Sequence, residues 1–211
     1  MLARIHGQFI SALRSKVRII QALNAQKALK YLALADTNLK GVVVADEGIA
    51  EEKNSEVLSS LIKWVNAGGI AIIGCVFPSL ISFTKFDPFF EKWGLPWTMG
   101  DYCGMTSVLN PLIRQSSRHS VNLMASYSTK AVHLKGVKVE DILYAHTREE
   151  EEDEYEDEDS SAQSRAFPPL MVNLSNVPVA YTRVGRGSLG YVGDVNAEEG
   201  STSAILAMLR L

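Results

Sequence analysis

The sequence predicts an α/β fold, a flavodoxin-like three-layer sandwich with a mostly parallel central sheet and an antiparallel extension. Residues 41–46 (GVVVAD) and 70–75 (IAIIGC) are continuous apolar runs, which are typical of parallel strands covered by helices on both faces. The segment between these runs has the spacing of an amphipathic helix. A strand, a helix and a second strand within about 35 residues form a βαβ unit, which defines the parallel part of the sheet.

The residues before this unit predict two helices and one short strand. Residues 6–15 and 25–34 carry apolar side chains at helical spacing, and residues 17–22 (VRIIQA) are a β-branched run. No strand-like run precedes the first of these helices, and we expect a fold that lacks its first strand. An uncovered sheet edge near Val17 to Ala22 would favour self-association.

The crossover helix is predicted to begin at Asn54 or Ser55, since either side chain can cap it. Gly68 and Gly69 should end this helix. Its apolar residues recur on one face and should pack on the sheet: Val57, Leu58, Leu61, Ile62 and Val65.

The middle of the chain is rich in aromatic residues and then in strand-like runs. Residues 86–102 (FDPFFEKWGLPWTMGDY) predict a short helix from Pro88 to Trp93 and a compact loop packed on the sheet. Residues 131–137 and 142–147 predict strands on either side of a turn at Gly136.

The carboxy-terminal segment predicts a hairpin and a closing helix. Residues 178–184 and 188–192 are two β-type runs around Gly185-Arg186-Gly187. Apolar residues at helical spacing follow over residues 201–211.

Charge is concentrated in one acidic segment. From Glu149 to Asp159 every residue except Tyr155 is acidic, which accounts for 10 of the 24 acidic residues and leaves 14 against 21 basic ones elsewhere. Such a run cannot bury apolar surface, so we expect residues 149–165 to be a disordered insert in a single domain spanning residues 1–211. It is either a solvated spacer or a tail that binds the basic body of the protein or a basic partner.

Two glycine-containing segments carry a family resemblance. The order GVVVADEGI, a helix ending in WVNAGG, and IAIIGC, together with the late segment VGRGSLGYVGDVN, resembles the class I glutamine amidotransferase-like superfamily. Within it the chain is most similar to the trehalose-utilisation (ThuA-like) branch and to uncharacterised fungal relatives. The resemblance covers residues 17–78 and 177–211.

The resemblance implies a catalytic cysteine on a sharp turn from a strand into a helix, with the pattern Gly-x-Cys-x-Gly. This chain has Gly74-Cys75-Val76-Phe77-Pro78 instead. Aligned on Gly74, Val76 stands at the nucleophile position and Pro78 replaces the glycine that the tight turn requires. Cys75 is one residue out of register, so its side chain would face the other way.

The second half of the implied site is also altered. The superfamily has a His-x-Glu segment after a late strand, where this chain has Asn196 and Glu198. A carboxamide cannot act as a base near neutral pH. We therefore predict a catalytically inactive amidotransferase-like domain without amidase or glutaminase activity, which acts as a binding or interaction module for an unknown small molecule or protein.

The alternative function is that of a cysteine-dependent hydrolase or transferase that uses Cys75 and Glu198 with a base not recognised in the sequence. Under either hypothesis the carboxyl ends of the parallel strands are the expected site. The residues predicted to form its rim are Asp46, Glu47, Gly74, Cys75, Asp194, Asn196 and Glu198.

Other chemistry has no motif in the sequence. His6, His119, His133 and His146 lie outside any motif and are expected to be surface or packed residues, and no metal or cofactor is predicted. Cys103 is expected to be inert. No membrane span is predicted, and nucleic-acid binding is not expected. The two cysteines favour the cytoplasm, although residues 1–35, which are basic and contain no acid, leave a mitochondrial transit peptide as the alternative.

Overall fold

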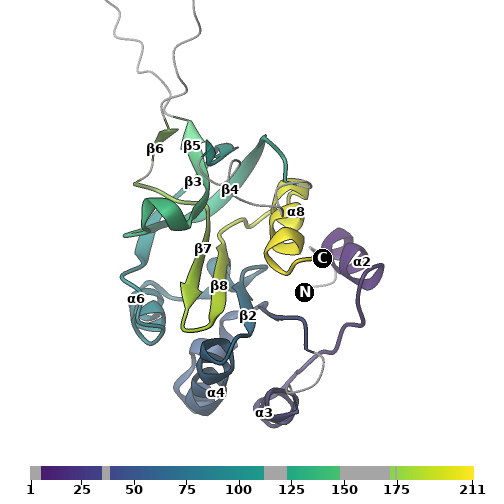
Figure 1. Cartoon of the computed structure of the whole chain (residues 1–211). Helices are drawn as coiled ribbons and strands as arrows, with labels where there is room; N and C mark the ends of the chain where they lie inside the picture. Colours follow the sequence, from purple (N-terminus) through teal and green to yellow (C-terminus); the bar gives the residue numbers. More distant parts are fainter. Residues whose placement is uncertain (1–5, 35–38, 112–122, 148–171, 174) are drawn as a thin grey trace, which may run out of the picture.

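A single sheet organises the protein, seen here in a computed structural model that describes residues 6–34, 39–111, 123–147, 172–173 and 175–211 (Figure 1). The strand order is β1-β2-β8-β7-β5-β3-β4, and β6 pairs with β5. The strands are β1 (Val42–Val44), β2 (Ile70–Ile73), β3 (Thr98–Leu109), β4 (Ser126–Lys135), β5 (Ile142–Thr147), β6 (Val172–Asn173), β7 (Val179–Val184) and β8 (Gly187–Val192).

Helices lie on both faces of this sheet. The α-helices are α2 (Gly7–Arg14), α3 (Ala25–Ala33), α4 (Ser55–Asn66), α5 (Phe77–Leu80), α6 (Phe83–Glu91) and α8 (Glu199–Met208). Short 3-10 turns are η1 (Glu47–Ala50), η2 (Glu52–Asn54) and η4 (Val139–Asp141).

The parallel part of the sheet consists of β1, β2 and β8. Val43 pairs with Ile72, and Ile72 pairs with Gly190 on its other side, both in parallel register. This arrangement confirms the predicted α/β class with its βαβ unit. The share of parallel pairing is smaller than expected, because β7, β5, β3, β4 and β6 all pair antiparallel.

The amino-terminal residues form the two predicted helices but not the predicted strand. Residues 6–34 contain α2 and α3 and no strand before β1. Residues 17–22, however, form neither strand nor helix, and Val17 and Ile19 pack on the core beside α2. The edge strands of the sheet are β1 and β4, so the predicted self-association cannot use a strand at residues 17–22.

The longest strand, β3, was not predicted. The sequence analysis treated its start as loop, because Gly100, Asp101 and Gly104 are residue types depleted in strands. The adjacent helix α6 extends from Phe83 to Glu91, rather than from Pro88 to Trp93. Both predicted strands that follow form, as β4 and β5, but each pairs with β3 instead of with the other.

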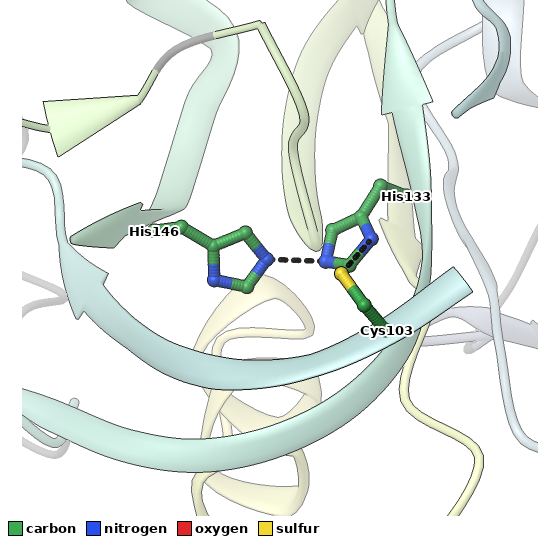
Figure 2. Close-up of side chains that lie close together, drawn as sticks. All are labelled: Cys103, His133 and His146. Atoms are coloured by element: carbon green, nitrogen blue, oxygen red, sulfur yellow. Dashed lines mark hydrogen bonds between the residues drawn. The ribbon is translucent and has the colours of Figure 1, made fainter. Parts of the chain in front are cut away.

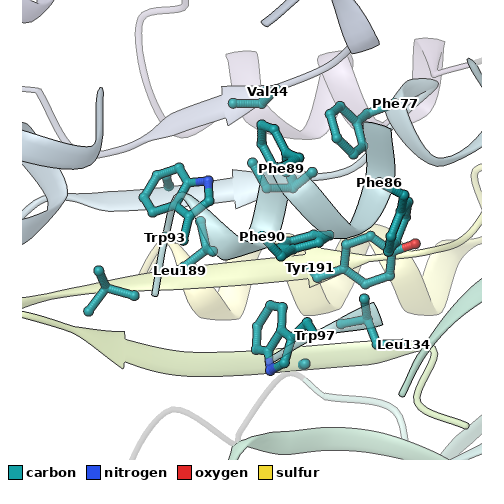
Figure 3. Packing of buried hydrophobic residues seen from close by; sticks show 14 of the residues in the cluster. Val44, Phe77, Phe86, Phe89, Phe90, Trp93, Trp97, Leu134, Leu189 and Tyr191 are labelled. Carbon is teal, nitrogen blue, oxygen red and sulfur yellow. The ribbon is translucent and has the colours of Figure 1, made fainter. Parts of the chain in front are cut away.

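Two cores lie on opposite faces of the sheet, as a three-layer sandwich requires. Alternate residues of β2 separate them: Ala71 and Ile73 face one core, and Ile70 and Ile72 face the other. The first core contains the predicted aromatic cluster around α6, in which Phe90 is fully buried and contacts Trp97 and Tyr191 with ring centroids 5.4 and 5.8 Å apart (Figure 3). The second core packs α2 against α8.

The acidic segment joins β5 to β6 and lies outside the described residues, so its predicted disorder stays a prediction. The same holds for the assignment of the whole chain to a single domain. No helix in the described ranges is long and apolar enough to span a bilayer.

Candidate functional site

The turn after β2 has the backbone of a nucleophile elbow. Gly74, Cys75 and Val76 link β2 directly to α5, and Cys75 has a φ of 58°, a conformation that L-residues adopt rarely. A residue held in this conformation between a strand and a helix is typical of the catalytic position in α/β hydrolytic folds. Cys75, and not Val76, therefore stands at the apex of the turn, which corrects the sequence alignment.

Pro78 does not prevent this turn. It lies in the first turn of α5, where a residue has no intrahelical use for an N–H group and where the fixed φ of proline suits the helix. The expectation that Pro78 disrupts the elbow was wrong for this reason.

A small cavity at the elbow, which Ser201 and Thr202 also line, has three titratable side chains. They are Cys75, His6 at the start of α2, and Asp194 after β8, and all three are buried. The packing of α2 against α8 brings His6 to this position, although it is far from Cys75 in sequence. The cavity has a volume of only ≈ 10 Å³, which is about the space that one water molecule needs.

Asp194 is fixed by the loop that follows β8. Its carboxylate accepts hydrogen bonds from the backbone N–H groups of Asn196 (2.8 Å) and Glu198 (2.7 Å). Asn196 is exposed, and Glu198 is half-buried at the start of α8. These two residues support the site through their backbone, and their side chains do not line the cavity.

Burial keeps both the thiol of Cys75 and the imidazole of His6 uncharged near neutral pH. Burial, followed by the charge of Asp194, raises the pKa of Cys75 to about 12. Burial lowers the pKa of His6, although the charge of Asp194 opposes the shift. The Nε2 atom of His6 is buried and has no hydrogen-bond partner among the described residues. The cavity therefore holds a neutral thiol near a neutral imidazole that are not hydrogen-bonded to each other.

The elbow has lost the usual donor for an oxyanion. In hydrolytic elbows the N–H group of the residue after the nucleophile stabilises the oxyanion. Here the N–H group of Val76 donates to the carbonyl oxygen of Ala45, at 3.0 Å, and so continues the pairing of β2 with β1. A carbonyl substrate would find neither room nor this donor.

The remaining predicted rim residues lie beside the cavity and do not line it. Asp46 is exposed, and its Oδ1 accepts a hydrogen bond from the N–H group of Gly48, which caps η1. Glu47 lies within η1. Gly74 contributes backbone to the turn, and its N–H group donates to the carbonyl oxygen of Val44 at 3.1 Å. Of the residues predicted to form the rim of the site, Cys75 and Asp194 line the cavity.

A second cluster lies in the antiparallel part of the sheet. Cys103 of β3, His133 of β4 and His146 of β5 converge so that one ligand atom of each lies within 4.8 Å of the others (Figure 2). Both histidines are buried. This cluster could not be predicted from the sequence, because its members come from three strands and their spacing matches no metal-binding motif. His6 could not be predicted either, for a different reason: no neighbouring residue marks it as special.

Comparisons with known proteins bear on the fold alone. No protein-family model matches the chain, and no curated protein matches its sequence. Among solved structures, the cytoplasmic protein STM1381 from Salmonella typhimurium LT2 is similar over 97% of this chain and 86% of its own, with a TM-score of 0.56 and 12% identity. A putative ThuA-like protein from Bacteroides uniformis covers 98% of this chain and 85% of its own, with a TM-score of 0.46 and 11% identity. The first likeness supports the α/β architecture, and the superfamily resemblance stays a prediction.

Proposed function

We propose that this protein is a non-hydrolytic domain that retains the elbow of an amidotransferase-like fold and acts as a binding or interaction module. The observation that carries the proposal is the closure of the elbow. Cys75 is 3% exposed, its cavity holds about one water molecule, and the neighbouring N–H group of Val76 is bonded to Ala45. A substrate carbonyl cannot reach a thiol in this setting.

A larger hollow between α4 and the end of α6 has room for a ligand. It has a volume of ≈ 440 Å³, within the range of roughly 300–1,000 Å³ that is common for small-molecule sites. Lys63 and Lys92 line it together with Ser55, Ser59 and the apolar side chains of Leu58 and Ile62. Two lysines and two hydroxyl groups favour an anionic ligand, so an anionic small molecule or an acidic peptide is the partner class that this hollow suits.

The second candidate function is thiol-dependent hydrolysis or transfer at Cys75. One observation favours it: His6 supplies the imidazole that the sequence analysis did not find, and its Nε2 atom has no hydrogen-bond partner among the described residues. A movement of α2 that opened the cavity would bring a general base within reach of the thiol. Asp194 would then orient the imidazole.

Hydrolysis assays distinguish the two functions. The full chain is assayed with glutamine and with p-nitrophenyl acetate, beside Cys75→Ala and His6→Gln. We expect the turnover of all three proteins to equal the uncatalysed background. The loss of an oxyanion donor alone costs about 100- to 1,000-fold in rate, and the raised thiol pKa adds to that loss.

Cys103→Ser is the matched control, because it removes the other thiol and leaves the elbow unchanged. Turnover that persists in Cys103→Ser and disappears in both Cys75→Ala and His6→Gln would overturn the proposal and establish the second candidate. Turnover that disappears only in Cys103→Ser would locate activity outside the elbow and would also contradict the proposal.

A further inference from the structure

The cluster of Cys103, His133 and His146 lies within the curved antiparallel sheet. The strand β3 runs between β5 and β4, and these strands bend around the two imidazole rings (Figure 2). The ring centroids of His133 and His146 are 4.4 Å apart, and their Nε2 atoms contact each other directly. The Sγ atom of Cys103 is 3.8 Å from Nδ1 of His133. This part of the molecule is separate from the elbow and independent of the proposed function.

Hydrogen bonds determine which nitrogen of each ring carries the proton. Nδ1 of His133 is 2.6 Å from the carbonyl oxygen of Asp101, and Nδ1 of His146 is 3.3 Å from that of Thr106. Because a carbonyl oxygen only accepts hydrogen bonds, both Nδ1 atoms must donate. A neutral imidazole has one N–H group, so both Nε2 atoms are unprotonated.

Two unprotonated Nε2 atoms that face each other repel, because each presents a lone pair to the other. The pair is stable only when a positive centre, either a proton or a metal cation, lies between the two nitrogens. Both rings are buried, where an unpaired positive charge is costly. A metal cation satisfies both lone pairs. Metal-binding histidines typically donate their other N–H group to a backbone carbonyl, as both rings do here.

We propose that Cys103, His133 and His146 bind one Zn²⁺ ion through the thiolate and the two Nε2 atoms. A thiolate with two imidazoles is a soft to borderline ligand set, which suits Zn²⁺ and does not suit Mg²⁺ or Ca²⁺. Binding releases the thiol proton of Cys103 to solvent, which this half-buried side chain can reach. The ion joins β3, β4 and β5 and so stabilises the antiparallel part of the sheet.

The position of Ser107 fits a water molecule as the fourth ligand of this ion. Three protein ligands leave one position of a tetrahedral zinc site for a water molecule. Ser107 pairs directly with His146 across β3 and β5, and its buried Oγ has no hydrogen-bond partner among the described residues. A water molecule on the ion would give this hydroxyl group a partner.

Zinc titration of the full chain tests the proposal. The reduced protein is stripped with EDTA and titrated with ZnCl₂ against a chromophoric chelator, and bound metal is counted by elemental analysis. We expect one zinc ion per chain and no competition from Mg²⁺. Changing a hydrogen-bond partner of a metal ligand typically weakens affinity by about 10- to 100-fold, and losing the ligand itself in Cys103→Ser or His146→Gln should weaken it by at least that factor.

Matched controls are Cys75→Ser and His6→Gln, which remove the same residue types from the elbow and should bind zinc normally. Cobalt gives a second signal, since a thiolate–Co²⁺ bond produces an intense near-ultraviolet band that should be present in the wild type and absent in Cys103→Ser. Cys103 is only half-buried, so this variant should fold even if His146→Gln does not. Less than one zinc per chain, or a Cys103→Ser variant with wild-type affinity or the cobalt band, would overturn the proposal.

Discussion

The two cysteine sites of this protein use the same residue types in opposite ways. At the elbow the backbone is strained, with Cys75 at a φ of 58°, while the nearby imidazole of His6 is not bonded to the thiol. In the antiparallel part Cys103 lies in a strand, and backbone carbonyls orient both imidazoles toward one point. A strained backbone alone therefore does not make a reactive site, and regular strands can bring a convergent set of side chains together.

The two cysteine sites also differ in the solvent exposure of their thiols. Cys75 is buried and Cys103 is half-buried, and burial is the main cause of the raised pKa at both thiols. The elbow is closed to solvent at its thiol. In the cluster of the antiparallel part, both histidines are buried and Cys103 is the half-buried member.

Thiol labelling should show the largest difference between the two cysteine sites. With a pKa of about 12 at Cys75, its thiolate fraction at pH 8 is lower than that of a free cysteine by roughly 1,000-fold or more. In metal-free native protein we expect iodoacetamide to modify Cys103 first and Cys75 far more slowly, because Cys75 is also the more deeply buried thiol. The rate at Cys75 should rise about tenfold per pH unit between pH 8 and 11, because the thiolate fraction does.

Mass spectrometry of the two cysteine peptides measures both rates in one sample. Added zinc provides the control, since it should protect Cys103 and leave Cys75 unchanged. Labelling of Cys75 as fast as that of Cys103 at pH 7 would indicate an activated thiol, and it would favour the hydrolase candidate.

The parallel half of the fold could be predicted from the sequence because its signals are local. The continuous apolar runs at residues 41–46 and 70–75 and the helix between them form as expected. The β3 strand could not be recognised, because Gly100, Asp101 and Gly104 disfavour strands and its stability comes from pairing with β4 and β5. Long-range pairing of this kind leaves little trace in a short window of sequence.

The candidate sites show the same limit. Cys75 and Asp194 were predicted because both follow strands whose carboxyl ends meet at one edge of the sheet. His6 reaches them through the packing of α2 on α8, which no motif records. His133 and His146 meet because three strands curve together, so their proximity depends on tertiary structure and not on sequence spacing.

Alanine and glycine substitutions at the two cysteines should have opposite signs. At position 75 we expect Cys75→Gly to be more stable than Cys75→Ala by about 1 kcal/mol, because the left-handed conformation costs an L-residue about that much. At position 103 we expect Cys103→Ala to be more stable than Cys103→Gly by about 0.5–1 kcal/mol, since glycine weakens a strand interior.

Urea unfolding in the presence of EDTA measures all four variants without a contribution from bound metal. Both variants at each position lack the thiol, so each difference isolates the effect of the backbone. If glycine were less stable than alanine at both positions, the strain assigned to Cys75 would be absent and the elbow would be an ordinary turn.

The smallest expected effect is that of deleting residues 149–164, which tests whether the acidic segment supports the cluster of the antiparallel part. This segment follows β5, the strand that holds His146, and leads toward β6, which pairs with β5 through His146 and Asn173. The stretch from Glu149 to Asp159 contains no basic residue that could pair with its carboxylates. Arg148 and residues 165–171 remain to connect the two strands, and the entropy of closing a connection depends only weakly on its length. We therefore expect the free energy of unfolding to change by less than about 1 kcal/mol, and zinc affinity to stay the same.

A large loss of stability in urea would show that the segment packs on the folded body. A loss of zinc affinity without a loss of stability would show instead that it positions β5, in which case the ligand geometry of His146 depends on more than the strands themselves.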